Sequence, residues 1–364
     1  MDWDTLRSFN PDPTPKEQPI SFDFLKGKER PILLVGNGVR NAGAQDLLNE
    51  VAFKFNIPVV STFLGVDLLN KVPSNFIGSI GIKGSRAGNF AINNADLVVS
   101  VGTSLNVAAT GYNYSHFARG AELVVVDIDT EEHSKGTVKI DKFIEADCKS
   151  FLLGLLNSDV IVPLEWATSC KRWARNWKVE PNDEPSSKVD LYTFINALDE
   201  LLPKNSVVVA DAGSSFYVPC QSIRNISNAR LVVPGAQAEM GFTIPASIGV
   251  AIGDPKATVV GITGDGSFQF NVQELETLKH LSPNVTIFVW NNDGYLSIKN
   301  TQDKFFKGNR VGSCKDSGVT LPDISKVVSA YGIPYINIPD TGSCKRMISE
   351  VLDMEGPVVC EVMC

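Results

Sequence analysis

The sequence is poor in the residues that build zinc sites. It has 3 histidines and 7 cysteines among 364 residues, and no two cysteines are spaced as Cys-x-x-Cys, so a thiolate or imidazole zinc site is not expected. An excess of basic residues is also lacking, because 33 lysines and arginines stand against 41 acidic residues, a net charge of −8. Nucleic acids and anionic membranes attract basic patches, and we therefore expect neither as a partner.

Long apolar runs are absent as well. No stretch approaches the roughly 18 consecutive apolar residues that a membrane span needs. The first residues, Met-Asp-Trp-Asp-Thr, have neither the basic flank nor the apolar run of a secretory signal. The seven cysteines are odd in number and include no Cys-x-x-Cys pair, so we interpret them as thiols. Together with the absence of a secretory signal, this favours a cytoplasmic protein. What is present fits an ordinary globular chain, with 43% hydrophobic and 20% charged residues.

The chain divides into four stretches by its pattern. Residues 1–29 are polar and proline-rich and indicate a linker. Residues 30–158 and 188–364 each alternate short apolar strands with helical patterns, and residues 159–187 connect them through a tryptophan-rich helix and a polar turn. The predicted fold class is α/β, with two doubly wound parallel-sheet domains. The expected strands are 32–35, 57–60, 96–101, 122–128, 207–210, 258–263, 286–290, 335–338 and 357–362. The expected helices are 42–55, 189–202, 237–252, 271–281, 324–331 and 344–354.

The residues just after each strand are the candidates for binding, because ligands of such sheets lie beyond the carboxyl ends of the strands. Several of these segments combine glycines, small residues and aspartates, a composition that suits phosphate and divalent metal ions. The segments are 36–38, 102–104, 127–129, 211–215, 264–267 and 291–294.

The strongest local signal is Gly264-Asp265-Gly266, which ends a β-branched strand at the start of a helix. The N–H groups of Gly266 and Ser267 are then placed to hold phosphate oxygens, and the Asp265 carboxylate is placed to bind a hard cation such as Mg²⁺. On its own, Gly-Asp-Gly is also common in ordinary turns.

A second polar turn follows the next strand, at Asn291-Asn292-Asp293-Gly294. It lies 292 − 265 = 27 residues later, the length of one helix and one strand, so both turns should emerge at the same sheet edge. The Asn292 side chain and the Gly294 carbonyl could then supply oxygens to the cation that Asp265 binds. Together the two turns are much more specific than either alone.

These two turns and the helix beginning at Glu274 resemble the signature of thiamine-diphosphate-dependent enzymes. The similar branch is that of acetolactate synthase and its carboligase and decarboxylase relatives. Residues 30–158 resemble the central domain of that family and residues 188–364 its diphosphate-binding domain. The resemblance implies thiamine diphosphate and Mg²⁺ as cofactors and pyruvate or another 2-oxo acid as substrate.

The resemblance also implies roles for single residues. Asp265, Asn292 and the Gly294 carbonyl would ligate Mg²⁺. Met240 matches the apolar residue that wedges beneath the cofactor and bends it, with plain core packing as the alternative. The Ala238 carbonyl and the Met240 N–H would hold the aminopyrimidine. The full set of expected cofactor-binding residues is Gly213, Ser214, Ser215, Ala238, Met240, Gly264, Asp265, Gly266, Ser267, Asn292, Gly294 and Tyr295.

The glutamate that activates the cofactor in this family is expected from outside the chain. Relatives carry it on a separate pyrimidine-binding domain and use it across a subunit interface, and Glu239 lies on the wrong domain to replace it. No catalytic residue is therefore assigned here. The expectation is one part or subunit of a lyase or transferase, a 2-oxo-acid decarboxylase-carboligase. A partner chain with that domain, or a homo-oligomer, would complete it.

Alternatives remain at this point. The chain could serve a simple 2-oxo-acid decarboxylase, or it could be a non-catalytic cofactor-binding or regulatory subunit. A nicotinamide oxidoreductase is disfavoured, since 36–41 does not complete Gly-x-Gly-x-x-Gly. Acetolactate synthases bind FAD in the central domain, but the segment where flavin-binding relatives have an arginine reads Thr103-Ser104-Leu105-Asn106 here. FAD is kept as a less favoured cofactor.

Overall fold

The computed structural model describes residues 20–71, 73–178, 188–223, 229–235 and 237–364. The chain forms two compact units, Met1–Trp177 and Lys178–Cys364. Most of the linker expected at 1–29, and the polar turn of the connector at 179–187, lie outside the described residues.

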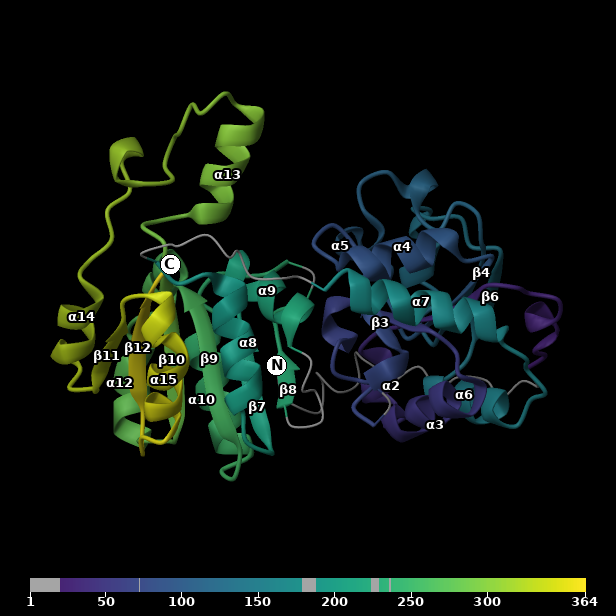
Figure 1. Cartoon of the computed structure of the whole chain (residues 1–364), viewed down its shortest axis with the longest axis horizontal. Coiled ribbons are helices and arrows are strands. Elements are labelled where there is room, and N and C mark those ends of the chain that lie inside the picture. Colours follow the sequence, from purple (N-terminus) through teal and green to yellow (C-terminus); the bar gives the residue numbers. More distant parts are fainter. Residues whose placement is uncertain (1–19, 72, 179–187, 224–228, 236) are drawn as a thin grey trace, which may run out of the picture. The chain divides into compact units, whose positions relative to one another are not determined.

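The first unit contains a six-stranded parallel sheet in the order β3-β2-β1-β4-β5-β6 (Figure 1). Its strands are β1 Pro31–Val35, β2 Val59–Ser61, β3 Phe76–Ser79, β4 Leu97–Val101, β5 Glu122–Asp127 and β6 Lys142–Glu145. Its α-helices are α2 Gly38–Asn41, α3 Gln45–Phe55, α4 Arg86–Asn94, α5 Val107–Thr110, α6 Cys148–Leu156 and α7 Leu164–Asn176. Short 3₁₀ helices are η1 Asp23–Leu25, η2 Phe63–Gly65, η3 Pro73–Asn75, η4 Tyr114–His116 and η5 Glu132–Lys135.

Helices cover both faces of this sheet, which explains its continuously apolar strands. In β1, Leu33 and Val35 join the core formed with α3 and α6, while Ile32 and Leu34 join the core formed with α4 and α7. Trp166 of α7 is buried in the second core, and its indole N–H donates to the Pro31 carbonyl at 2.9 Å. The tryptophan-rich helix therefore packs on the first unit.

The second unit repeats the architecture, with strand order β11-β12-β10-β9-β7-β8. Its strands are β7 Ser206–Ala210, β8 Ala229–Val232, β9 Thr258–Gly264, β10 Val285–Asn291, β11 Tyr335–Ile338 and β12 Val358–Met363. Its helices are α8 Leu191–Leu201, α9 Ser214–Ser222, α10 Thr243–Gly253, α11 Asp265–Phe268, α12 Glu274–Leu281, α13 Leu296–Phe305, α14 Ile324–Ala330 and α15 Thr341–Leu352, with 3₁₀ helices η6 Gln269–Asn271 and η7 Lys315–Ser317.

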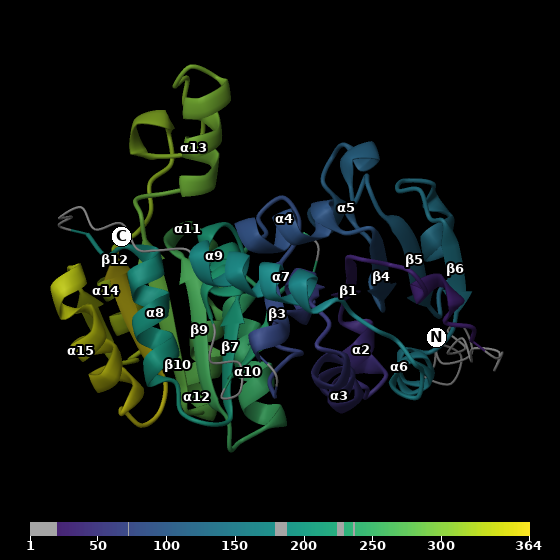
Figure 2. The ribbon, with the colours of Figure 1, turned by 45° about the vertical axis from the view of Figure 1, so that its right-hand side comes forward.

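The core of the second unit also has two sides. Helices α10, α12 and α14 pack on one face of the sheet. On the other face, Phe194 of α8 meets Phe288 and Trp290 of β10 edge to face, with ring centroids 5.0 and 5.6 Å apart. Figures 1 and 2 both show α13 projecting away from this sheet. Within the described residues, no helix combines the length and the apolar character that crossing a membrane requires.

The predicted fold class is confirmed, since both sheets are parallel and flanked by helices. Three strands were not predicted: β3, β6 and β8. The helix predicted over 237–252 is wrong at its beginning, because α10 starts at Thr243. Ala238 and Gly241 before it have positive φ angles of 53° and 82°, which interrupt a helix.

Candidate functional site

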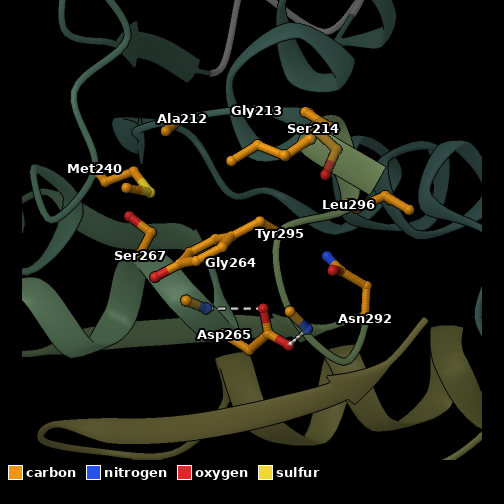
Figure 3. A pocket seen from close by; sticks show the side chains of 14 residues that line it. Ala212, Gly213, Ser214, Met240, Gly264, Asp265, Ser267, Asn292, Tyr295 and Leu296 are labelled. Carbon is orange, nitrogen blue, oxygen red and sulfur yellow. Dashed lines mark hydrogen bonds between the residues drawn. The ribbon is translucent and has the colours of Figure 1, made fainter. Parts of the chain in front are cut away.

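A pocket of about 120 Å³ opens at the carboxyl ends of the strands of the second unit. Strands β10, β9 and β7 are neighbours and all parallel, so the loops that follow them meet at this edge. Figure 3 shows the side chains around the pocket, with the ring of Tyr295 between the other groups. The lining residues are Ala212, Gly213, Ser214, Met240, Gly264, Asp265, Gly266, Ser267, Asn292, Gly294, Tyr295, Leu296, Ser297 and Ile298.

Asp265 begins α11 at the bottom of this pocket and is only 2% exposed. Its Oδ1 accepts the Gly266 N–H at 2.8 Å, and its Oδ2 accepts the Gly294 N–H at 2.9 Å. Burial raises the pKa of Asp265, while these N–H donors and the charge of Lys299 act in the opposite direction. Among the described residues no lysine or arginine forms a salt bridge with this carboxylate. The site thus holds a buried acidic group whose desolvation is only partly offset by the hydrogen bonds that it accepts.

Asn292 supplies a second buried oxygen to the pocket. Its side-chain Oδ1 is inaccessible and has no hydrogen-bond partner among the described residues. A buried acceptor without a partner costs about 1–3 kcal/mol, so this oxygen is available to ligate a cation or to accept a hydrogen bond from a ligand. The backbone of the same loop is held in place, since Lys299 Nζ donates to the Asn292 and Asp293 carbonyls at 2.7 and 3.1 Å.

These oxygens fit a hard divalent cation. A carboxylate and an amide oxygen are typical Mg²⁺ ligands, and Mg²⁺ usually takes its remaining ligands from phosphates and water. Within the described part of the chain, no group of three or more histidine, cysteine or acidic residues could hold a metal ion by itself. A cation bound here would therefore need oxygens from a ligand, as the set of Asp265, Asn292 and the Gly294 carbonyl implies.

The backbone of the pocket floor has no room for side chains. A Cβ atom at Gly266 would lie 2.4 Å from Cε1 of Tyr295, and one at Gly294, where φ is +114°, would lie 2.6 Å from the Ser313 carbonyl oxygen. Both glycines allow close approach of a neighbouring segment. The structure also differs from the expectation for the Gly266 N–H, which donates to Asp265 rather than being free for a phosphate.

Met240 lies on the pocket wall with 39% of its surface exposed. It sits between Ala238 and Gly241, whose positive φ angles turn the chain before α10. Core packing, the alternative considered from the sequence, therefore does not describe this residue. Its exposure leaves an apolar side chain on the wall of the pocket, where a ligand can contact it.

Not every residue expected at the site lies in the pocket. Ser215 is buried behind it, with its hydroxyl 2.9 Å from Asp211 Oδ1, and Ala238 is not part of the lining. The other residues expected to bind the cofactor do line it, which places them together without testing their roles. The pocket also includes Ala212 and the beginning of α13, which were not selected from the sequence.

The glycines of the first unit are explained by packing within the protein. A Cβ atom at Gly36 would lie 2.2 Å from the Gly102 carbonyl oxygen, and one at Gly38 would lie 2.6 Å from Gly102 Cα. The turn after β1 therefore rests directly on the end of β4. These contacts require glycine whether or not a nucleotide binds, so they do not test FAD binding. FAD as a less favoured cofactor therefore stays a prediction.

Two family profiles match the chain. The profile described as the C-terminal TPP binding domain of thiamine pyrophosphate enzymes matches residues 211–362. The profile described as the central domain of thiamine pyrophosphate enzymes matches residues 21–155. The first match contains all the lining residues of the pocket, and the second covers the first sheet.

Curated relatives carry the name acetolactate synthase. The large subunit from Buchnera aphidicola subsp. Schizaphis graminum is 30% identical over 337 residues, which cover 90% of this chain and 57% of the relative. The isozyme 3 large subunit of Escherichia coli K12 is 29% identical over 364 residues, 96% of this chain and 62% of the relative. Acetolactate synthase 1 of Nicotiana tabacum, described as chloroplastic, is 29% identical over 354 residues, 93% of this chain and 52% of the relative. The chain thus spans less than two thirds of the length of each of these relatives.

Proposed function

Because the chain belongs to the thiamine pyrophosphate enzyme family, we propose that its second unit binds thiamine diphosphate through Mg²⁺. We further propose that it forms part of a 2-oxo-acid decarboxylase-carboligase resembling acetolactate synthase, with pyruvate as the first substrate to test. The observation that carries the proposal is the pairing, in one pocket, of the buried Asp265 carboxylate with the unpartnered Asn292 Oδ1.

Each wall of the pocket has a proposed task. Asp265, Asn292 and the Gly294 carbonyl would hold Mg²⁺, and the Ser267 N–H and the 213–214 segment would contact the diphosphate. Met240 would support the apolar part of the cofactor. When bound, thiamine diphosphate supplies an electron sink for the carbanion left after loss of carbon dioxide. The residues of this chain bind and orient it, and the proton transfers at its pyrimidine ring need a glutamate from another domain.

Calorimetric titration of the full chain tests the proposal. We expect thiamine diphosphate to bind with one site per chain in the presence of Mg²⁺ and to lose its affinity when EDTA removes the metal, since the diphosphate and the carboxylate otherwise repel each other. Thiamine without phosphates is the matched control: it should bind far more weakly than thiamine diphosphate when Mg²⁺ is present, and its binding should not change when EDTA removes the metal. Absence of binding with Mg²⁺ present would contradict the proposal.

Replacement of Met240 by alanine separates a binding role from a structural one. Because the side chain is exposed, Met240→Ala should change the free energy of unfolding by less than about 0.5 kcal/mol. The affinity for thiamine diphosphate should fall about tenfold, as an apolar contact of this size contributes roughly 1.5 kcal/mol. Urea unfolding and calorimetry measure the two effects. A variant that loses stability but keeps affinity would show that Met240 supports the fold instead.

The remaining proposals concern partners and location. We propose that a partner chain or a second copy supplies the pyrimidine-binding domain, and that the protein is cytoplasmic. No disulfide joins the cysteines of the described residues, which supports a reducing compartment.

A further inference from the structure

A second buried aspartate lies directly behind the pocket. Asp211 follows β7, is 0% exposed and is not among the lining residues. Its Oδ1 accepts the Ala212 N–H at 2.6 Å and the Ser215 hydroxyl at 2.9 Å, and its Oδ2 accepts the hydroxyl groups of Thr263 and Ser267, both at 2.7 Å. In the part of the chain that the structure describes, no lysine or arginine forms a salt bridge with it. A buried carboxylate of this kind depends entirely on such donors.

The donors to Asp211 come from separate walls of the pocket. Ala212 begins the wall that continues through 213–214, and Ser267 ends the wall formed by 264–267. The Ser267 oxygen also accepts the Gly241 N–H at 2.7 Å, and Gly241 directly follows Met240. One carboxylate thereby connects the loop after β7, the short helix after β9 and the turn that carries Met240.

The charge on Asp211 sets the direction of this chain of hydrogen bonds. Ser267 has a single hydroxyl proton, which it donates to Asp211, and this leaves its oxygen free to accept from Gly241. The Gly241 carbonyl is held in turn by the Asn271 side chain at 2.8 Å. An amide at 211 would place its NH2 group either against the hydroxyl groups of Thr263 and Ser267 or against the Ala212 N–H and the Ser215 hydroxyl, so one of the two sets of hydrogen bonds would be lost or reversed. The segments that Asp211 connects would then be held less firmly.

We propose that Asp211 is a positioning residue for the cofactor pocket and acts through Ser267 on the turn that carries Met240. The inference rests on the proposed function, because it concerns the same pocket. It adds a residue that touches neither metal nor cofactor but fixes three of the segments that would.

The test compares variants of the full chain by calorimetric titration with thiamine diphosphate and Mg²⁺. Asp211→Asn and Ser267→Ala should each weaken binding at least about tenfold, since each breaks a charge-assisted buried hydrogen bond that holds the pocket walls together. The double variant should bind thiamine diphosphate with about the affinity of whichever single variant binds it less tightly, because both changes break the same Asp211–Ser267 hydrogen bond.

Ser206→Ala is the matched control. Ser206 begins the same strand, β7, at the opposite end from the pocket, is 2% exposed, and donates one hydrogen bond to the Pro203 carbonyl at 2.7 Å. Its replacement removes one buried serine hydroxyl, as Ser267→Ala does, and should weaken cofactor binding less than about threefold. Urea unfolding of every variant measures the accompanying loss of stability.

The outcomes are distinct. A larger loss of affinity in Asp211→Asn than in Ser206→Ala at equal loss of stability supports the positioning role, because the Asp211 side chain does not line the pocket. If Asp211→Asn fails to fold, the same comparison is made with Thr263→Val, which removes one donor to Asp211 outside the pocket lining. Affinity that merely follows stability across the variants, or normal binding by Asp211→Asn, overturns it while the proposed function stands. Failure of the unaltered chain to bind thiamine diphosphate would overturn both.

Discussion

Asp265→Asn is expected to weaken the binding of thiamine diphosphate with Mg²⁺ by at least about 100-fold, or about 2.8 kcal/mol. The asparagine keeps the size of the side chain but removes the negative charge that attracts the cation. Calorimetric titration with the metal present measures the effect. Binding within threefold of the unaltered chain would contradict the assignment of Asp265 as a metal ligand.

The same substitution should leave the unliganded fold largely intact. Burial raises the pKa of Asp265, which means that the charged form is unfavourable in the folded chain. Removal of the charge therefore offsets the loss of one N–H hydrogen bond, and we expect the free energy of unfolding to change by no more than about 1 kcal/mol. Reduced affinity with retained stability is the signature of a binding residue.

Asp293→Asn is the control for this experiment. Asp293 has an exposed side chain in the next loop, and its φ of +59° is one that asparagine adopts readily. The change in net charge is the same, but the side chain does not line the pocket. The control should bind the cofactor normally. Equal weakening in both variants would indicate a general effect of charge.

The isolated 364-residue chain is expected to turn over pyruvate about 100- to 10,000-fold more slowly than a full-length acetolactate synthase. Thiamine diphosphate and Mg²⁺ would be bound, but general acid-base catalysis at the pyrimidine ring contributes about 10²–10⁴-fold. We propose that the glutamate for this step comes from another domain. Carbon dioxide release measures the rate.

Addition of a chain that carries the pyrimidine-binding domain should raise this rate, and analysis of the product separates the remaining alternatives. An acetolactate-type product indicates a carboligase, whereas free acetaldehyde indicates a simple decarboxylase. Cofactor binding without activity, even with candidate partners, would favour a regulatory subunit. Full activity of the isolated chain would contradict the requirement for a second domain.

The positions of Asp265 and Asn292 could be predicted from the sequence because each lies in the turn directly after a strand, and the two strands are neighbours. Asp265 and Asn292 each follow an apolar strand, and β9 and β10 pair in parallel with Gly264 opposite Trp290. Two turns that follow paired strands in this register must lie side by side. Spacing along the chain was therefore enough to bring both residues to one edge.

Other parts of the site depend on contacts that spacing does not reveal. The Asp211–Ser267 hydrogen bond joins residues 56 positions apart, and it requires that β7 lies beside β9 and that both side chains point inward. The pocket also includes residues of α13. The exposed apolar side chains of this helix, such as Ile298 and Phe305, give no clear amphipathic pattern. Neither feature could be derived from periodicity.

The strands that were not predicted have a common place in the sheets. β3, β6 and β8 are all at sheet edges, where only one side of the strand is paired. β3 contains a glycine, and β6 begins and ends with charged residues and has no fully buried position. Edge strands need less apolar sequence than central strands, so the pattern that identified the buried strands was too weak here.

A crystal structure of the chain with thiamine diphosphate and Mn²⁺, which replaces Mg²⁺ and scatters anomalously, shows whether Asp265 and Asn292 share one cation. We expect one anomalous peak within about 2.3 Å of both an Asp265 carboxylate oxygen and Asn292 Oδ1, with diphosphate oxygens completing the coordination. A metal bound elsewhere, or a cofactor seated with these two oxygens bound to no common cation, would contradict it.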